Sequence, residues 1–144
     1  MTVHATLEKF GYPASEVKAY EHWVVLVRPA QPTLGSLVLA ARSTATAFGD
    51  LPAGAHAELA EITRDIEAAL ATFSGYEKLN YLMLMMVDPQ VHFHVIPRYE
   101  GAREWQGIAF ADAGWPGPPA LGDAHKLTGD EPDAMRAALQ ALWA

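Results

Sequence analysis

The sequence predicts a single α+β domain, residues 1–144, in which an antiparallel sheet packs against one long helix and a C-terminal helix. Three observations support this prediction. Strand-like segments occur in pairs on either side of one long amphipathic segment, in the order β-β-α-β-β. The link between the first two is short and proline-rich, which favours an antiparallel pair. With 144 residues, 51% of them hydrophobic and 19% charged, the chain can form one compact core.

The first strands follow a polar segment, residues 16–22, that fits neither a helical nor a strand period. Residues 23–27 are Trp-Val-Val-Leu-Val, a run typical of a strand buried on both faces. Pro29 and Pro32 interrupt the pattern. Residues 34–40 then predict a second strand.

A long helix is expected from Asp50 or Pro52 to Gly75. Its apolar residues recur at spacings of three and four and form one stripe: Leu59, Ile62, Ile66, Ala69, Leu70 and Phe73. Residues 78–87 show little polar alternation, which predicts a third strand covered on both faces.

The fourth strand carries the most informative pattern in the chain. Polar and apolar residues alternate strictly from Gln90 to Val95, so the polar ones share a face: Gln90, His92 and His94. The two imidazoles should then lie roughly 6–7 Å apart, displayed on the outer face of the sheet. Pro89 and Pro97 are expected to bound the strand.

Beyond Tyr99 the composition changes to glycine, proline and tryptophan. Residues 100–128 predict a long irregular segment that covers the site or forms a dimer contact. A last helix is expected to begin at Pro132.

Composition excludes several classes of protein. A net charge of −7 disfavours a nonspecific nucleic-acid binder. No apolar run approaches the roughly 20 residues that a membrane helix needs, so no membrane partner is expected. Residues 1–10 are charged and polar where a signal peptide would be apolar, which favours a cytoplasmic location. The absence of cysteine excludes disulfides and thiolate metal sites.

The run Gln90-Val91-His92-Phe93-His94-Val95-Ile96-Pro97-Arg98 resembles the signature of the histidine triad (HIT) family, and the wider resemblance covers residues 23–99. It implies a HIT-like fold and a cytoplasmic homodimer whose sheet continues across both subunits. It also implies a nucleotide hydrolase or nucleotidyl transferase acting on dinucleoside polyphosphates or nucleoside phosphoramidates. The reaction would pass through a covalent nucleotidyl-histidine intermediate, with no cofactor.

By the resemblance His92 is the nucleophile, His94 contacts the phosphate, and Gln90 holds the first triad position. A neutral imidazole is a competent nucleophile near neutral pH. If the second imidazole were positive, it would lower the pKa of the first and donate to phosphate oxygens. Gln90 can hydrogen-bond but cannot exchange a proton near neutral pH.

Four further residues are candidates for substrate binding: Asn80, Arg28, Arg98 and Trp105. Asn80 matches a position near the nucleotide in relatives, or makes an ordinary strand hydrogen bond. The two arginines either neutralise phosphate charge or lie in solvent on the surface. Trp105 stacks on a base, covers the pocket, or anchors the core or a dimer. The remaining histidines are expected to be structural or on the surface: His4, His22, His56 and His125.

Two other functions remain open at this point. The first is a nucleotide-binding module with weak or no catalysis, because the first triad position is Gln90. The second is a metal-binding protein, since histidines at i and i+2 of a strand also hold zinc or iron with a third ligand, here Glu100 or His125.

Overall fold

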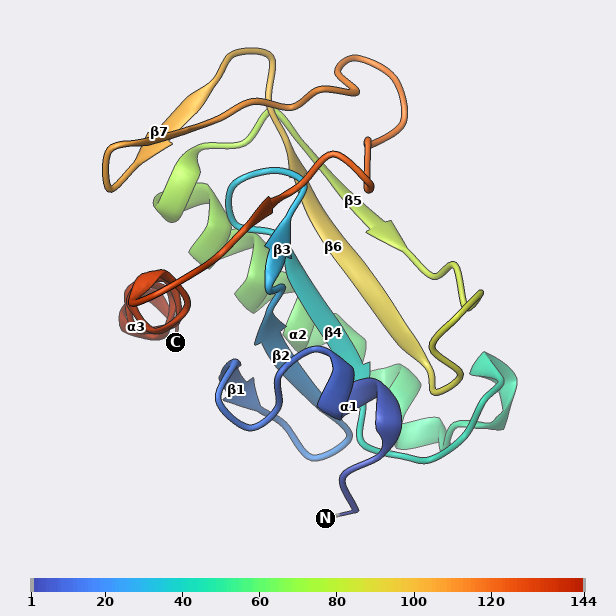
Figure 1. The fold of residues 1–144 in the computed structure, drawn as a ribbon. Coiled ribbons are helices and arrows are strands. Elements are labelled where there is room, and N and C mark those ends of the chain that lie inside the picture. Colours follow the sequence, from blue (N-terminus) through green and yellow to red (C-terminus); the bar gives the residue numbers. More distant parts are fainter. Residues whose placement is uncertain (1, 144) are drawn as a thin grey trace.

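The computed structural model describes residues 2–143 and has a five-stranded antiparallel sheet at its centre (Figure 1). The strands lie in the order β1 (Glu16–Ala19), β2 (Trp23–Val27), β4 (Leu37–Ala41), β6 (His92–Arg98) and β5 (Lys78–Leu82). Each neighbouring pair is antiparallel. The predicted α+β class is therefore confirmed.

Two short strand pairs and three α-helices complete the fold. The pairs are β3 (Ala30–Gln31) with β9 (His125–Lys126), and β7 (Arg103–Trp105) with β8 (Ile108–Phe110). The helices are α1 (Ala5–Lys9), α2 (Ala53–Ser74) and α3 (Glu131–Leu142), and a 3-10 turn, η1 (Phe48–Asp50), precedes α2. Among residues 2–143 there is no helix long and apolar enough to cross a membrane.

The central sheet separates two apolar layers. On one face α2 and α3 pack against alternate strand residues, and this larger core includes Val25, Leu39 and Val95. On the other face α1 covers a smaller cluster that includes Leu26 and Val38. The two faces explain why β2 and β4 are apolar at every position, since each strand is buried on both sides. The layers are visible in Figure 1, where α1 and α2 lie on opposite sides of the sheet.

The long helix is confirmed close to its expected bounds. It ends at Gly75, whose φ of 62° gives the left-handed cap that glycine adopts without strain. The indole N–H of Trp23 donates to the carbonyl of Ala55 at 2.8 Å and ties the first turn of α2 to β2.

The third strand is shorter than expected. Within residues 2–143 it lies at the edge of the sheet and pairs only with β6, and that ladder ends where Leu82 lies opposite His94. The expectation of a strand over residues 78–87 covered on both faces is wrong. Residues 84–87 leave the sheet, and Met86 and Val87 are 86% and 79% exposed.

Pro97 lies inside β6, where the sequence predicted that it would end the strand. The carbonyl of Pro97 accepts a hydrogen bond from the hydroxyl of Thr33, on the side of β6 that faces β4. The ladder between β4 and β6 reaches only as far as Leu37 and Val95. No backbone partner is present for an N–H at this position, so the ring is tolerated there.

Gly35 offers a test of how tightly the turn before β4 is packed. Its φ is 86°, and an added Cβ would lie 3.2 Å from Cδ2 of Leu70 on α2. We expect Gly35→Ala to lower the free energy of unfolding by about 1 to 3 kcal/mol, measured by urea denaturation. Gly49→Ala is the matched control because nothing lies within 4 Å of its Cβ position. Equal stability of the two variants would contradict this account of the turn.

Candidate functional site

His92 opens strand β6, and its backbone fixes the state of its ring. Nδ1 of His92 lies 2.8 Å from the main-chain oxygen of Gln90. A carbonyl oxygen can only accept, so Nδ1 donates and carries the hydrogen. In the neutral ring the lone pair then belongs to Nε2, which is the form that a nucleophilic histidine needs.

His94 lies two residues along the same face, with its ring centroid 5.0 Å from that of His92. Nε of Arg28 donates to Nδ1 of His94 at 3.4 Å, and a guanidinium has no acceptor. Nδ1 is therefore the accepting nitrogen, and Nε2 carries the proton of the neutral ring. His94 thus presents an N–H donor that a phosphate oxygen can accept from.

The surroundings of His94 keep it uncharged near neutral pH. Burial lowers its pKa to about 4, and the positive charge of Arg28 acts in the same direction. From the sequence we considered a positive second imidazole beside the first, whereas His94 is neutral and the positive group beside it is the guanidinium of Arg28.

Both imidazoles are buried, whereas from the sequence we expected them to be exposed on the outer face of the sheet. His92 is 2% exposed and His94 8%, because the ring of Phe10 lies 5.7 Å from each of them. They nevertheless line a cavity of about 240 Å³. Its walls come from the end of α1 and the residue after it, the residue after β2, the segment after β5, β6, and Leu121: Lys9, Phe10, Arg28, Leu84, Met85, Met86, Val87, Asp88, His92, His94 and Leu121. The histidines thus lie at the bottom of a pocket, not in the solid core.

The charges around this cavity favour an anion. Lys9 and Asp88 form an ion pair of 3.3 Å at its wall. Arg28 donates to the carbonyl of Ala30 and to His94, and none of the carboxylates of residues 2–143 forms an ion pair with it. Burial lowers the pKa of Arg28, which means that its charge is partly desolvated. A phosphate group would supply the missing negative partner.

Gln90 has a different role from the one its triad position suggested. Its side-chain oxygen accepts from the N–H of Thr6 at 3.2 Å and from the hydroxyl of Thr6 at 2.7 Å. The amide thereby fastens α1 to the start of β6, and the residue does not line the histidine cavity. Its main-chain oxygen, which orients His92, is the part of Gln90 that touches the proposed chemistry.

Three other candidates lie away from the histidines. Arg98 is 4% exposed and donates to Asp112 at 2.7 and 3.1 Å, so it is neither a solvated surface arginine nor a free phosphate ligand. Asn80 accepts from Arg98 at 2.9 Å and lines a neighbouring cavity with it. Trp105 packs 6.5 Å from Phe73 of α2, which supports its alternative role as an anchor against the core.

The sequence analysis missed the residues that close the pocket. Helix α1 is only five residues long, too short for a hydrophobic period, and it supplies Lys9 and leads into Phe10. The sequence predicts a strand over residues 84–87 because an apolar run of this length does not distinguish a buried strand from an exposed segment that lines a pocket. The sequence offers only a weak signal for this wall of the pocket, namely the charged Lys9 next to the aromatic Phe10.

The metal-site alternative finds no support in the positions of its proposed third ligands. His125 contacts the ring of Phe110 and lies 3.4 Å from Glu131, and Glu100 is exposed. Within the described residues no three histidine, aspartate or glutamate side chains gather as metal ligands do. His4 is structural: its ring bonds to the carbonyl of Ala41 and caps α1.

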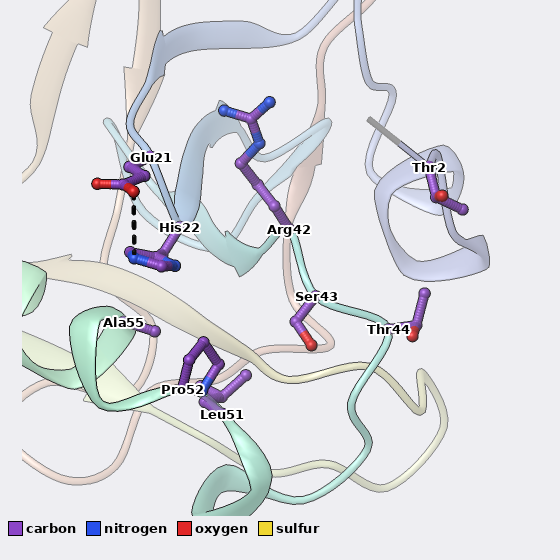
Figure 2. Close-up of a pocket in the computed structure, with 9 residues that line it drawn as sticks. All are labelled: Thr2, Glu21, His22, Arg42, Ser43, Thr44, Leu51, Pro52 and Ala55. Carbon is purple, nitrogen blue, oxygen red and sulfur yellow. Dashed lines mark ion pairs between the residues drawn. The ribbon is translucent and has the colours of Figure 1, made fainter.

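A larger cavity, of about 600 Å³, lies where the loop after β4 meets the start of α2 (Figure 2). Ser43 lines it, but neither strand histidine does. Figure 2 shows the ring of His22 facing Glu21, at 3.9 Å, and the guanidinium of Arg42 pointing away from Leu51. Of these two cavities, the smaller one is lined by His92 and His94.

Solved structures resemble this chain over nearly its full length. A histidine triad protein from Bradyrhizobium japonicum is 25% identical, with a TM-score of 0.75, over 99% of this chain and 98% of that one. One from Sinorhizobium meliloti is 24% identical, with a TM-score of 0.75, over 98% and 96%. One from Marinobacter aquaeolei is 22% identical, with a TM-score of 0.69, over 99% and 95%. No protein-family model and no curated protein matches the sequence.

The lowered pKa of His94 predicts a pH dependence of stability. The unfolded chain takes up a proton at His94 near the ordinary pKa of about 6.5, whereas the folded chain does so only near 4. Stability contributed by the neutral ring is thus present above pH 6.5 and is lost as the pH falls towards 4. We expect wild type to lose on the order of 2 kcal/mol more than His94→Gln between pH 7 and 4, measured by urea unfolding. Parallel losses in the two proteins would contradict the assignment.

Proposed function

We propose that this chain, which belongs to the histidine triad family of nucleotide-binding hydrolases and transferases, cleaves nucleotides through a covalent nucleotidyl intermediate on His92. The observation that carries the proposal is the hydrogen bond from Nδ1 of His92 to the carbonyl of Gln90. It leaves the lone pair of Nε2 available in a cavity that Arg28 makes positive.

The proposed reaction has two displacement steps. Nε2 of His92 attacks the α-phosphorus of a nucleotide, the N–P bond forms, and the bond from phosphorus to the leaving group breaks. Water then attacks the same phosphorus, the N–P bond breaks, and the nucleoside monophosphate leaves with the imidazole restored. The N–H of His94 at Nε2 donates to a non-bridging oxygen in both steps, and Arg28 lies beside it as a positive charge.

The residue type at the first triad position favours one class of leaving group within this scheme. An amine that leaves a phosphoramidate must gain a proton, and the amide of Gln90, which bonds to Thr6 outside the cavity, has none to give. A polyphosphate leaves as a stable anion near neutral pH and needs no such donor. Dinucleoside polyphosphates are therefore the favoured substrates of the proposed enzyme, and nucleoside phosphoramidates are slower.

We also propose that the protein is a homodimer whose sheet continues through β5. This strand lies at the edge of the sheet, and within the described residues it pairs only with β6. An exposed edge with a row of unpaired backbone groups can add a strand from a second copy.

Trapping of the intermediate tests the nucleophile. We expect wild type incubated with diadenosine tetraphosphate and quenched in acetonitrile to gain the mass of one adenylyl group, and His92→Ala to gain none. His125→Ala is the matched control, because His125 lies on β9 outside the cavity and should still be labelled. If wild type binds the nucleotide but shows neither label nor turnover, the protein is a binding module and the catalytic proposal is wrong.

Restoring an imidazole at the first triad position tests the missing proton donor. We expect Gln90→His to raise the kcat for adenosine 5′-phosphoramidate on the order of 10-fold or more, and to change the kcat for diadenosine tetraphosphate little. Gln90→Asn is the control, since it keeps an amide and has no titrating group. Equal effects on the two substrates would contradict the role assigned to the leaving group.

A further inference from the structure

A second cavity lies on the same face of the sheet as the histidines, farther along β5 and β6. Its volume is about 410 Å³. It is enclosed by the two strands and a segment that follows β8: Lys78, Asn80, Arg98, Trp115, Pro116, Gly117 and Pro118. None of the residues that line it belongs to the histidine cavity.

The strand register relates the two cavities. Leu82 of β5 lies opposite His94, and Asn80 lies opposite Ile96. Two residues along a strand span about 7 Å, so Asn80 lies one such step beyond the level of His94. The segment after β8 connects the sites as well, since Leu121 lines the histidine cavity. In Figure 1 this segment runs past the ends of β5 and β6 and then back across the sheet. One extended molecule can thus reach both cavities.

Hydrogen bonds of Arg98 hold the segment after β8 that forms one wall of the second cavity. Arg98 binds the carboxylate of Asp112 through two nitrogens and the carbonyl of Gly117 at 2.8 Å. The ion pair is almost fully buried, with side-chain exposures of 5% for Arg98 and 1% for Asp112. A Cβ at Gly114 would lie 2.1 Å from the carbonyl of Pro118, so the turn is closed as tightly as glycine permits. The cavity is therefore formed before any ligand arrives.

The groups that face this cavity suit an aromatic ring that carries phosphate. Trp115 is half-buried, and within residues 2–143 its indole has neither a ring contact nor a hydrogen bond. The amide of Asn80 uses its oxygen on Arg98, and its NH₂ group remains available as a donor. Lys78 is exposed at the rim and brings a positive charge. Stacking on tryptophan, amide hydrogen bonding and an ammonium group together fit a nucleoside with attached phosphates.

We propose that the cavity around Trp115 binds the second nucleoside of a dinucleoside polyphosphate while the first phosphate of the same molecule lies at His92. This inference rests on the proposed function and adds a substrate subsite to it. The base of the leaving nucleotide stacks on Trp115, Asn80 donates to it, and Lys78 contacts the polyphosphate chain. The subsite selects for dinucleotides over mononucleotides.

The test compares the KM values of two substrates in variants of Trp115 and Lys78, which line the second cavity. For Trp115→Ala we expect the KM for diadenosine tetraphosphate to rise about 10-fold, with the KM for adenosine 5′-phosphoramidate unchanged. Trp115→Phe should recover most of the loss because it keeps an aromatic face. Lys78→Ala should raise the KM for diadenosine tetraphosphate and leave the KM for adenosine 5′-phosphoramidate unchanged. The matched control is Lys126→Ala, which removes an exposed lysine on β9. Equal changes for both substrates, or none for either, would overturn the subsite and leave the catalytic proposal standing.

Direct binding separates failure of the subsite from failure of catalysis. If wild type turns over neither substrate, calorimetry with diadenosine tetraphosphate and with adenosine monophosphate still decides the inference. Tighter binding of the dinucleotide that Trp115→Ala abolishes supports the subsite. Equal affinities for the two nucleotides in wild type overturn it.

Discussion

The hydrogen bond of 2.8 Å from Nδ1 of His92 to the carbonyl of Gln90 is the contact on which the proposed chemistry depends. It requires an extended backbone at the start of β6, and the larger core supplies that constraint. Val91 and Val95 are fully buried beneath α2, on the face opposite the histidines. A slip of one residue would exchange the two faces and place imidazoles in an apolar core. The register that buries the valines therefore also orients His92, the proposed nucleophile.

Burial of two imidazoles beside a guanidinium costs desolvation free energy, which the surrounding contacts must offset. Helix α1 covers the rings, and hydrogen bonds hold it there: those of Thr6 to Gln90, and that of His4 to the carbonyl of Ala41. The side chain of Gln90 thus has a structural role, since it holds α1 to the start of β6. The same burial keeps His94 neutral, so the positive group beside it is the guanidinium of Arg28.

The central elements could be predicted from sequence because each has a strong internal period. The alternation of residues 90–95 and the helical stripe ending at Gly75 are local patterns, and the structure has a strand and a helix there, although the strand, His92–Arg98, begins two residues later than the alternation and runs past Pro97. The walls of the site could not be predicted in this way. Helix α1 is too short for a period, and the contact between Arg98 and Asp112 depends on a loop path that no local pattern fixes. Arg98 thus looked like a surface residue although it is buried.

The histidine cavity is too small to enclose a whole nucleotide. At about 240 Å³ it is smaller than the roughly 300 to 1,000 Å³ of pockets that enclose a drug-sized ligand. A phosphate and adjoining atoms would fit in it, and under the proposed function the rest of a nucleotide would lie outside it. Met86 and Val87 at the rim are exposed and apolar, and the sheet continues past the rings towards Asn80. In the proposed enzyme, discrimination between substrates would therefore depend on surfaces that lie beyond the two imidazoles, and the triad pattern alone does not specify it.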